Sequence, residues 1–131
     1  MTFYVATALA HRDEAKRIMS VIEARGHTIS LDWTRDSVLE RPYTKDESAA
    51  RYRAERDVKA VIHSDVFILL SSSEVTRSAH VELGTALMSS IVGGKPQIFV
   101  IGEHKDHGMF FFHPKVQRVK TIDDVFVILN Q

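Results

Sequence analysis

Short apolar runs alternate along this chain with longer segments whose apolar residues recur at helical spacing, and this alternation constrains the fold more than any other feature. Strands that alternate with helices form a parallel sheet covered on both faces. We therefore expect an α/β fold with one doubly wound parallel sheet of about five strands, a three-layer sandwich of the flavodoxin or Rossmann type. The pattern predicts strands at residues 3–9, 27–33, 66–70, 97–101 and 116–119, and helices at 13–25, 45–63, 78–92 and 121–129.

Glycine, proline and polar residues mark the ends of these elements. Gly26 is in the position where a glycine commonly ends a helix, and Thr121 can cap the last helix. Two longer segments, 34–44 and 102–114, predict loops, and the first of them could cover a site.

Length and charge narrow the class of protein. The 131 residues suit a single domain spanning 1–131, and 17 basic residues balance 17 acidic ones. Without a net positive field or a basic stripe, neither nucleic acid nor a membrane surface is an expected partner. The chain has no cysteine, signal-peptide pattern or long apolar span, so we expect a soluble cytoplasmic protein.

The loop after the first strand does not carry a dinucleotide fingerprint. Residues 6–11 read Ala-Thr-Ala-Leu-Ala-His, with none of the glycines of a Gly-x-Gly-x-x-Gly motif. A dinucleotide-dependent enzyme is therefore not expected, and no cofactor is predicted.

Glu82 is the first candidate for chemistry. It follows the apolar run 66–70 and a polar loop, and we expect it in the first turn of the next helix. Ligands of open α/β sheets bind beyond the carboxyl ends of the strands, where a carboxylate can act on them. The helix dipole alone also favours an acidic residue there. Gly84 tips the balance towards a site, because a helix tolerates glycine where a ligand or a backbone approaches closely.

Asp57 is a second carboxylate in an unusual place. The helix 45–63 has an apolar stripe of Ala50, Ala54, Val58 and Val61, and Asp57 falls within it. A buried aspartate requires partners, so the alternative to a functional role is a structural pair with Arg53 or a backbone amide.

These carboxylates belong to an ordered set of motifs that resembles a known family. The chain is similar to the nucleoside 2-deoxyribosyltransferase family, which includes deoxynucleoside 5'-monophosphate N-glycosidases, over nearly its whole length. The most specific element is an aspartate about 25 residues before a Glu-Leu-Gly that opens a helix. The motifs are Phe3 to Ala6, Gly26-His27, Asp32-Trp33, Asp57 to Ile68, Glu82-Leu83-Gly84 and Gly94-Lys95-Pro96.

The resemblance implies a mechanism. The glutamate matching Glu82 attacks C1' of a deoxyribonucleoside and forms a covalent glycosyl-enzyme, from which a second base or water takes the sugar. The aspartate matching Asp57 binds near the base or sugar and assists protonation of the leaving base. This is retaining glycoside chemistry, and it needs Glu82 ionised and Asp57 able to share a proton. We expect the helix N-terminus to favour the ionised form of Glu82.

The resemblance also implies substrate contacts from several loops. Relatives hold a 5'-phosphate with a glycine-rich, arginine-containing first loop; here only Arg12 and hydroxyls such as those of Thr76 and Ser78 could serve, so a phosphate requirement stays open. Tyr4 and Trp33 could stack on a base. The candidate substrate-binding residues are Tyr4, Ala6, Thr7, Leu9, Arg12, Trp33, Ser71, Thr76, Ser78, Met109 and Phe110.

The loop 102–114 combines three histidines with an apolar run. A metal site at His104, His107 and His113 is disfavoured, because their spacing matches no common zinc pattern. The run 109–112 is expected to be buried over the ligand or against a second subunit, since the resemblance implies a homodimer or larger homo-oligomer.

Several functional alternatives stay open. Transfer and hydrolysis share their first half-reaction, and neither the sugar nor the base is determined. A non-catalytic nucleotide-binding or signalling module can use the same scaffold. A glutamate-dependent NAD glycohydrolase resembling the TIR-type domains is a third possibility.

Overall fold

A computed structural model describes residues 1–74 and 76–131 and contains one parallel five-stranded sheet. The strand order is β2-β1-β3-β4-β5, and every neighbouring pair is parallel. This confirms the predicted doubly wound α/β fold. The strands are β1 (Thr2–Ala6), β2 (Thr28–Ile29), β3 (Val66–Leu70), β4 (Gln97–Ile101) and β5 (Val116–Val119).

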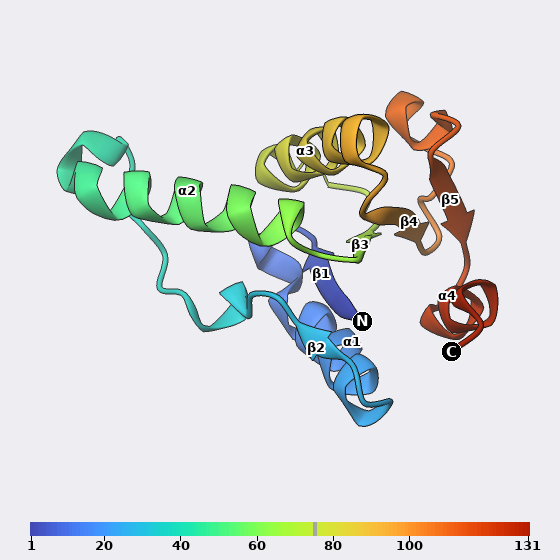
Figure 1. Ribbon diagram of the computed structural model, residues 1–131. Coiled ribbons are helices and arrows are strands. Elements are labelled where there is room, and N and C mark those ends of the chain that lie inside the picture. Colours follow the sequence, from blue (N-terminus) through green and yellow to red (C-terminus); the bar gives the residue numbers. More distant parts are fainter. Residues whose placement is uncertain (75) are drawn as a thin grey trace.

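Four helices form the outer layers of the sandwich. They are α1 (Arg12–Ala24), α2 (Glu47–Ile62), α3 (Arg77–Gly93) and α4 (Ile122–Leu129). In Figure 1, α2 and α3 lie on one side of the sheet, and α1 and α4 lie on the other. Alternate side chains of β1 point to these two layers: the ring of Phe3 lies 6.2 Å from that of Phe126 in α4, whereas Tyr4 contacts Glu82 in α3.

The central strands carry the core. All five residues of β3 are buried, as are the last four of β1 and of β4. The predicted bounds of β3, β4 and β5 are confirmed. A strand with neighbours on both edges and helices on both faces has no solvent side, which explains its unbroken apolar sequence.

The first two strands are shorter than predicted. β1 ends at Ala6, and Leu9 belongs to the 3-10 helix η1 (Leu9–His11). β2 ends at Ile29, because Asp32 caps the 3-10 helix η2 (Trp33–Arg35) by accepting a hydrogen bond from the Thr34 amide at 3.1 Å. The strand predicted over 27–33 is therefore wrong beyond Ile29.

Helix ends follow the expected capping chemistry. Gly26, just past α1, has φ +85° and Gly94, just past α3, has φ +84°, the left-handed backbone that favours glycine. Thr121 and Asp124 form a capping box at the start of α4. The segment predicted as the start of the second helix is instead a 3-10 turn, η3 (Tyr43–Asp46), and Asp46 caps α2.

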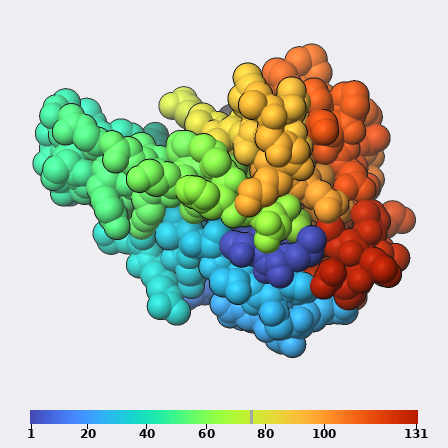
Figure 2. Space-filling model, in the orientation of Figure 1, coloured from blue at the N-terminus to red at the C-terminus, as the bar shows by residue number. Residues whose placement is uncertain are grey.

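The amino-terminal half of α2 projects from the body together with η3, as Figure 2 shows for the green and teal arm. Nearly every side chain of the segment 39–48 is exposed. Across the described ranges 1–74 and 76–131, no helix has the length and apolar content needed to cross a membrane.

Candidate active site

The centre of the site is a hydrogen bond between two side chains far apart in the sequence. The Tyr4 hydroxyl donates to Oε2 of Glu82. Tyr4 is 1% exposed, and its ring stacks on Phe67 of β3 with 5.9 Å between centroids. Strand β1 and helix α3 therefore hold the Glu82 carboxyl against the sheet.

Glu82 lies deeper in its helix than the sequence predicts. Because α3 begins at Arg77, Glu82 is in the second turn and no acidic residue occupies the first. The expectation that the helix N-terminus favours the ionised form is therefore wrong. Burial raises the pKa of Glu82 to about 7, against the hydrogen bond from Tyr4, which lowers it. Near neutral pH, a proton can move on and off this carboxyl with little driving force.

Asp57 faces the protein, but not along the predicted stripe. Ala54 and Val58 of that stripe are exposed, whereas Asp57, Ala60 and Val61 are at least half-buried. The helix is therefore rotated relative to the predicted orientation. The cause is that polar side chains, and not only small apolar ones, make the contacts of its inner face.

The partner of Asp57 is Arg56, where the sequence pointed to Arg53 or a backbone amide. The Arg56 guanidinium lies 2.9 Å and 3.0 Å from Oδ1 of Asp57, through its NH2 and Nε atoms. Burial raises the pKa of Asp57 above its ordinary value, while the Arg56 pair lowers it. Sequence patterns did not identify Arg56 or its second partner Asp36, because both look like ordinary surface charges.

The two carboxylates form one electrostatic site. The negative charge of Asp57 contributes to the raised pKa of Glu82. Burial, and then the charge of Glu82, raise the pKa of the Tyr4 hydroxyl, with a smaller contribution from Asp57. A buried tyrosine donor, a glutamate that titrates near neutrality and a second carboxylate from a different helix can together bind and attack an electrophilic carbon.

Several predicted substrate contacts are buried or bonded within the chain. Ala6 is buried, and the Thr7 hydroxyl donates to the Leu70 carbonyl at 3.3 Å. The Trp33 indole N–H donates to the Val5 carbonyl at 2.7 Å, so this side chain fixes η2 to β1. Its ring is buried in the core, which corrects the expectation that it could stack freely on a base.

Other predicted contacts lie at the carboxyl ends of the strands. Leu9 is exposed and Arg12 is half-buried at the start of α1. Ser71 accepts a hydrogen bond from the His104 amide at 3.1 Å, which ties the loop 102–114 to the end of β3. The Thr76 hydroxyl lies 3.2 Å from Nδ1 of His80, and Ser78 is exposed. In the part of the chain that the structure describes, the side-chain hydrogen bonds of Glu82 and Asp57 go to Tyr4 and Arg56 and not to this group.

The loop 102–114 is only partly buried within this chain. It contains the 3-10 helix η4 (Met109–Phe112), from which Phe111 is buried and stacks on His80. Met109, Phe110 and Phe112 are exposed. Burial of these three side chains against ligand or partner therefore stays a prediction.

The histidines of this loop do not form a three-ligand cluster. Nδ1 of His104 lies 3.3 Å from Nδ1 of His107, and Nδ1 of His113 accepts from the Lys115 amide at 3.0 Å. Among the described residues, no three His, Cys, Asp or Glu side chains are grouped as a metal ion would require.

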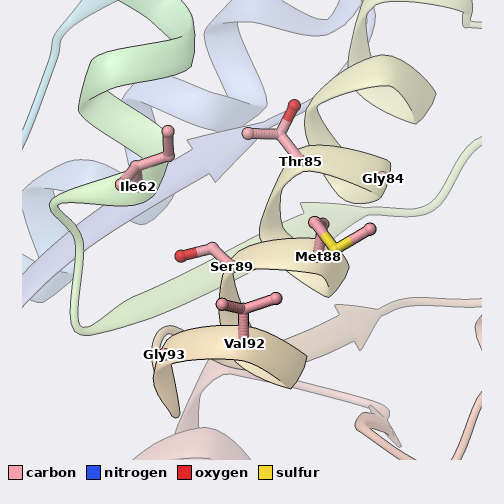
Figure 3. Close-up of a pocket in the computed structure, with 7 residues that line it drawn as sticks. All are labelled: Ile62, Gly84, Thr85, Met88, Ser89, Val92 and Gly93. Atoms are coloured by element: carbon pink, nitrogen blue, oxygen red, sulfur yellow. The ribbon is translucent and has the colours of Figure 1, made fainter.

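One surface hollow lies away from the carboxylates. It has a volume of about 620 Å³ and lies along the outer side of α3, next to the end of α2 (Figure 3). Because Tyr4, Asp57 and Glu82 do not line it, we place the active site by its chemistry and not by this hollow. The lining residues are Ile62, Gly84, Thr85, Met88, Ser89, Val92 and Gly93.

Comparison with known proteins supports the fold. The chain matches no protein-family model and none of the curated proteins with which it was compared. Among solved structures, it is similar to that of a CMP N-glycosidase from Clostridium botulinum, BcmB. The two share 12% sequence identity and a TM-score of 0.61, with 100% of each chain covered. At this identity the likeness shows a shared fold and leaves the activity to be tested.

Proposed function

We propose that this protein breaks the N-glycosidic bond of a nucleoside, deoxynucleoside or 5'-monophosphate through a covalent glycosyl-glutamate on Glu82. The observation that carries this proposal is the hydrogen bond from the buried Tyr4 hydroxyl to Glu82, which is coupled to Asp57 by charge. The family resemblance of these residues supports the same chemistry. So does the fold shared with a protein described as a CMP N-glycosidase.

The reaction divides into two steps. In the first, ionised Glu82 attacks C1' while the bond from C1' to the base nitrogen breaks, and the base leaves with that electron pair and takes up a proton from solvent water. Tyr4 orients the attacking carboxylate, and Asp57 binds the sugar or base and assists the departure. In the second step, water or another base attacks C1' and releases Glu82 as a carboxylate. No cofactor takes part in this scheme.

Product analysis tests the proposal directly. The protein is incubated with nucleosides, deoxynucleosides and their 5'-monophosphates, each with and without a different free base. Exchange of the base indicates transfer, and free sugar or sugar phosphate indicates hydrolysis. We expect Glu82→Gln to abolish both, and a trapped glycosyl adduct on wild-type protein to be visible by intact mass. Absence of turnover with every compound would refute the enzymatic proposal.

One observation favours a second candidate, a non-catalytic nucleotide-binding module. Polar groups of the first loop already pair within the chain: Nε2 of His11 lies 3.1 Å from the Ser72 hydroxyl and 3.7 Å from a Glu74 carboxylate oxygen. Nucleotide binding without turnover, equal in wild type and Glu82→Ala, would support this candidate. NAD belongs in the same panel, since release of nicotinamide would identify a TIR-like glycohydrolase.

We also propose that the chain is a homo-oligomer that pairs through the outer side of α3. Residues 83–94 contain no charged side chain, and Val81, Met88, Ile91 and Val92 are exposed. The chain exposes 7763 Å², which is about 800 Å² more than the ~7,000 Å² typical of a compact monomer of this mass; the exposed segment 39–48 contributes to this excess together with the α3 face. One subunit buries about 800 Å² in an interface of standard size. An uncharged face suits a second copy, because no like charges meet across a two-fold axis.

Two matched valines test this interface. Val92 is 79% exposed near the end of α3, and Val127 is 78% exposed near the end of α4, on the other side of the sheet. We expect Val92→Lys to shift the light-scattering mass towards that of one chain, whereas Val127→Lys leaves the mass of the wild type. A monomeric wild type, or equal masses for the two variants, would contradict the proposal.

A further inference from the structure

Arg56 connects the candidate carboxylate to a different part of the chain. Its guanidinium binds Oδ1 of Asp57 on the same helix and both carboxylate oxygens of Asp36, at 3.1 Å and 2.5 Å. Asp36 directly follows η2, which Trp33 fixes to β1 through the Val5 carbonyl. The position of Asp57 is therefore defined by α2 and also by a segment anchored to the sheet.

The contacts engage only one oxygen of Asp57. Both Arg56 nitrogens approach Oδ1, and in the described part of the chain Oδ2 has no hydrogen-bond donor. The ion pairs are partly shielded, since the Arg56 side chain is 21% exposed and that of Asp57 is 32% exposed. A charge-assisted pair in such surroundings is stronger than an exposed one.

We propose that Arg56 is a positioning residue that holds Asp57 as a carboxylate and leaves its Oδ2 to accept a hydrogen bond from a substrate hydroxyl or base N–H. The kinetic part of this inference rests on the proposed function. Asp57 then acts first as an anionic acceptor in the free protein, while ionised Glu82 keeps the role of nucleophile.

The charges around Asp57 support this assignment. Burial raises the pKa of Asp57 above its ordinary value; against it, Arg56 and to a smaller extent Arg53 on α2 favour the ionised form, and Asp36 opposes it. Across the interface with α3 and β1, Asp57 interacts by charge with Glu82 and with Tyr4. Of these groups, only Arg56 makes a hydrogen bond to Asp57, so its removal changes the ionisation of Asp57 most.

Arg53 provides a matched control. One turn before Arg56, its guanidinium donates to the Ser37 carbonyl at 2.6 Å and lies 3.1 Å from the Ser37 hydroxyl. Both arginines thus hold the segment 36–37 against α2, but Arg53 has no hydrogen bond to Asp57. Loss of a purely structural clamp would affect Arg53→Gln and Arg56→Gln alike.

Carbon-13 NMR of labelled aspartate carboxyls tests the inference without any substrate. The Asp57 signal is assigned by its loss in Asp57→Asn. We expect Arg56→Gln to move the Asp57 titration midpoint upward by about one pH unit or more. Arg56→Lys, which keeps the charge and loses the two-pronged contact, should give an intermediate shift, and Arg53→Gln a much smaller one.

Kinetics add the functional readout. With a substrate identified by product analysis, we expect Arg56→Gln to raise KM about tenfold at neutral pH, because the acceptor oxygen is displaced, with a smaller effect on kcat. An Asp57 midpoint unchanged by Arg56→Gln, or moved equally by Arg53→Gln, would overturn the inference. If wild type turns over no nucleoside, the proposed function fails, while the NMR titration still decides the role of Arg56.

Discussion

Replacing Tyr4 with phenylalanine removes one hydroxyl from the site and tests whether Glu82 is the group that controls activity. The Tyr4 ring is buried and stacked on Phe67, and phenylalanine keeps that ring. The variant therefore changes the hydrogen bond to Glu82 with little change in packing.

The size of the effect follows from the lost bond. A hydrogen bond to a charged acceptor contributes about 1.5–3 kcal/mol, and 1.36 kcal/mol corresponds to one pKa unit. Because the Tyr4 bond lowers the pKa of Glu82, which burial raises to about 7, its loss should raise that pKa by ~1–2 units. At pH 7 the ionised fraction of Glu82 then falls roughly 5-fold to 50-fold.

The assay is the pH dependence of kcat/KM between about pH 5.5 and 10. For wild type, we expect the rate to rise with pH through about 7, as Glu82 loses its proton. For Tyr4→Phe, the rising limb should move to higher pH, with the deficit largest near neutrality and smallest in alkaline buffer. Tyr52→Phe, which alters an exposed tyrosine on α2, should behave as wild type. An unmoved limb in Tyr4→Phe would refute Glu82 as the titrating nucleophile.

Three further changes test individual contacts. Burial raises the pKa of Glu82 from 4.5 to about 7. Between these pH values the carboxyl ionises in the unfolded chain but stays protonated in the folded one, so the folded state loses stability as pH rises. Glu82→Gln should thus raise the unfolding free energy by up to about 3 kcal/mol at pH 8 and by almost nothing at pH 4 in urea titrations. Gly102→Ala should cost ~1–3 kcal/mol, because φ is +115° and the added Cβ would lie 2.7 Å from the Ser71 hydroxyl; an unchanged melting temperature would contradict this. Thr121→Ala should lose the capping box of α4 and about 1 kcal/mol, measured by the same titration.

The sheet was largely predictable because its strands are bounded by strong local signals. Buried central strands such as Val66–Leu70 admit no polar residue, so an unbroken apolar run defines both ends. The end of the edge strand β2 was not predictable in this way. Its alternating apolar residues continue to Trp33, although strand pairing stops at Ile29. Asp32 accepts a hydrogen bond from the chain two residues later, and this local contact outweighs further strand pairing.

The inner face of α2 shows why Asp57 faces the protein for a reason other than the predicted apolar stripe. Periodicity assumes that small apolar side chains face the sheet, and it therefore put Asp57 inside a stripe of alanines and valines. In the structure two members of that stripe are exposed, and Arg53 and Arg56 reach back to the segment that follows β2. Asp57 faces inward because its neighbours form a polar clamp. Such a clamp joins residues 20 positions apart and leaves no periodic trace.

The ionisation of Glu82 could not be predicted from the neighbouring sequence, for a related reason. A helix start can be recognised from nearby residues, and its dipole predicts a lowered pKa. The structure places Glu82 one turn further along α3, where burial against Tyr4, 78 positions away, determines its pKa instead. Desolvation of a carboxyl can shift its pKa by several units, whereas a helix dipole contributes at most about 2 kcal/mol. The residue with the most informative sequence context thus owes its chemistry to contacts that exist only after folding.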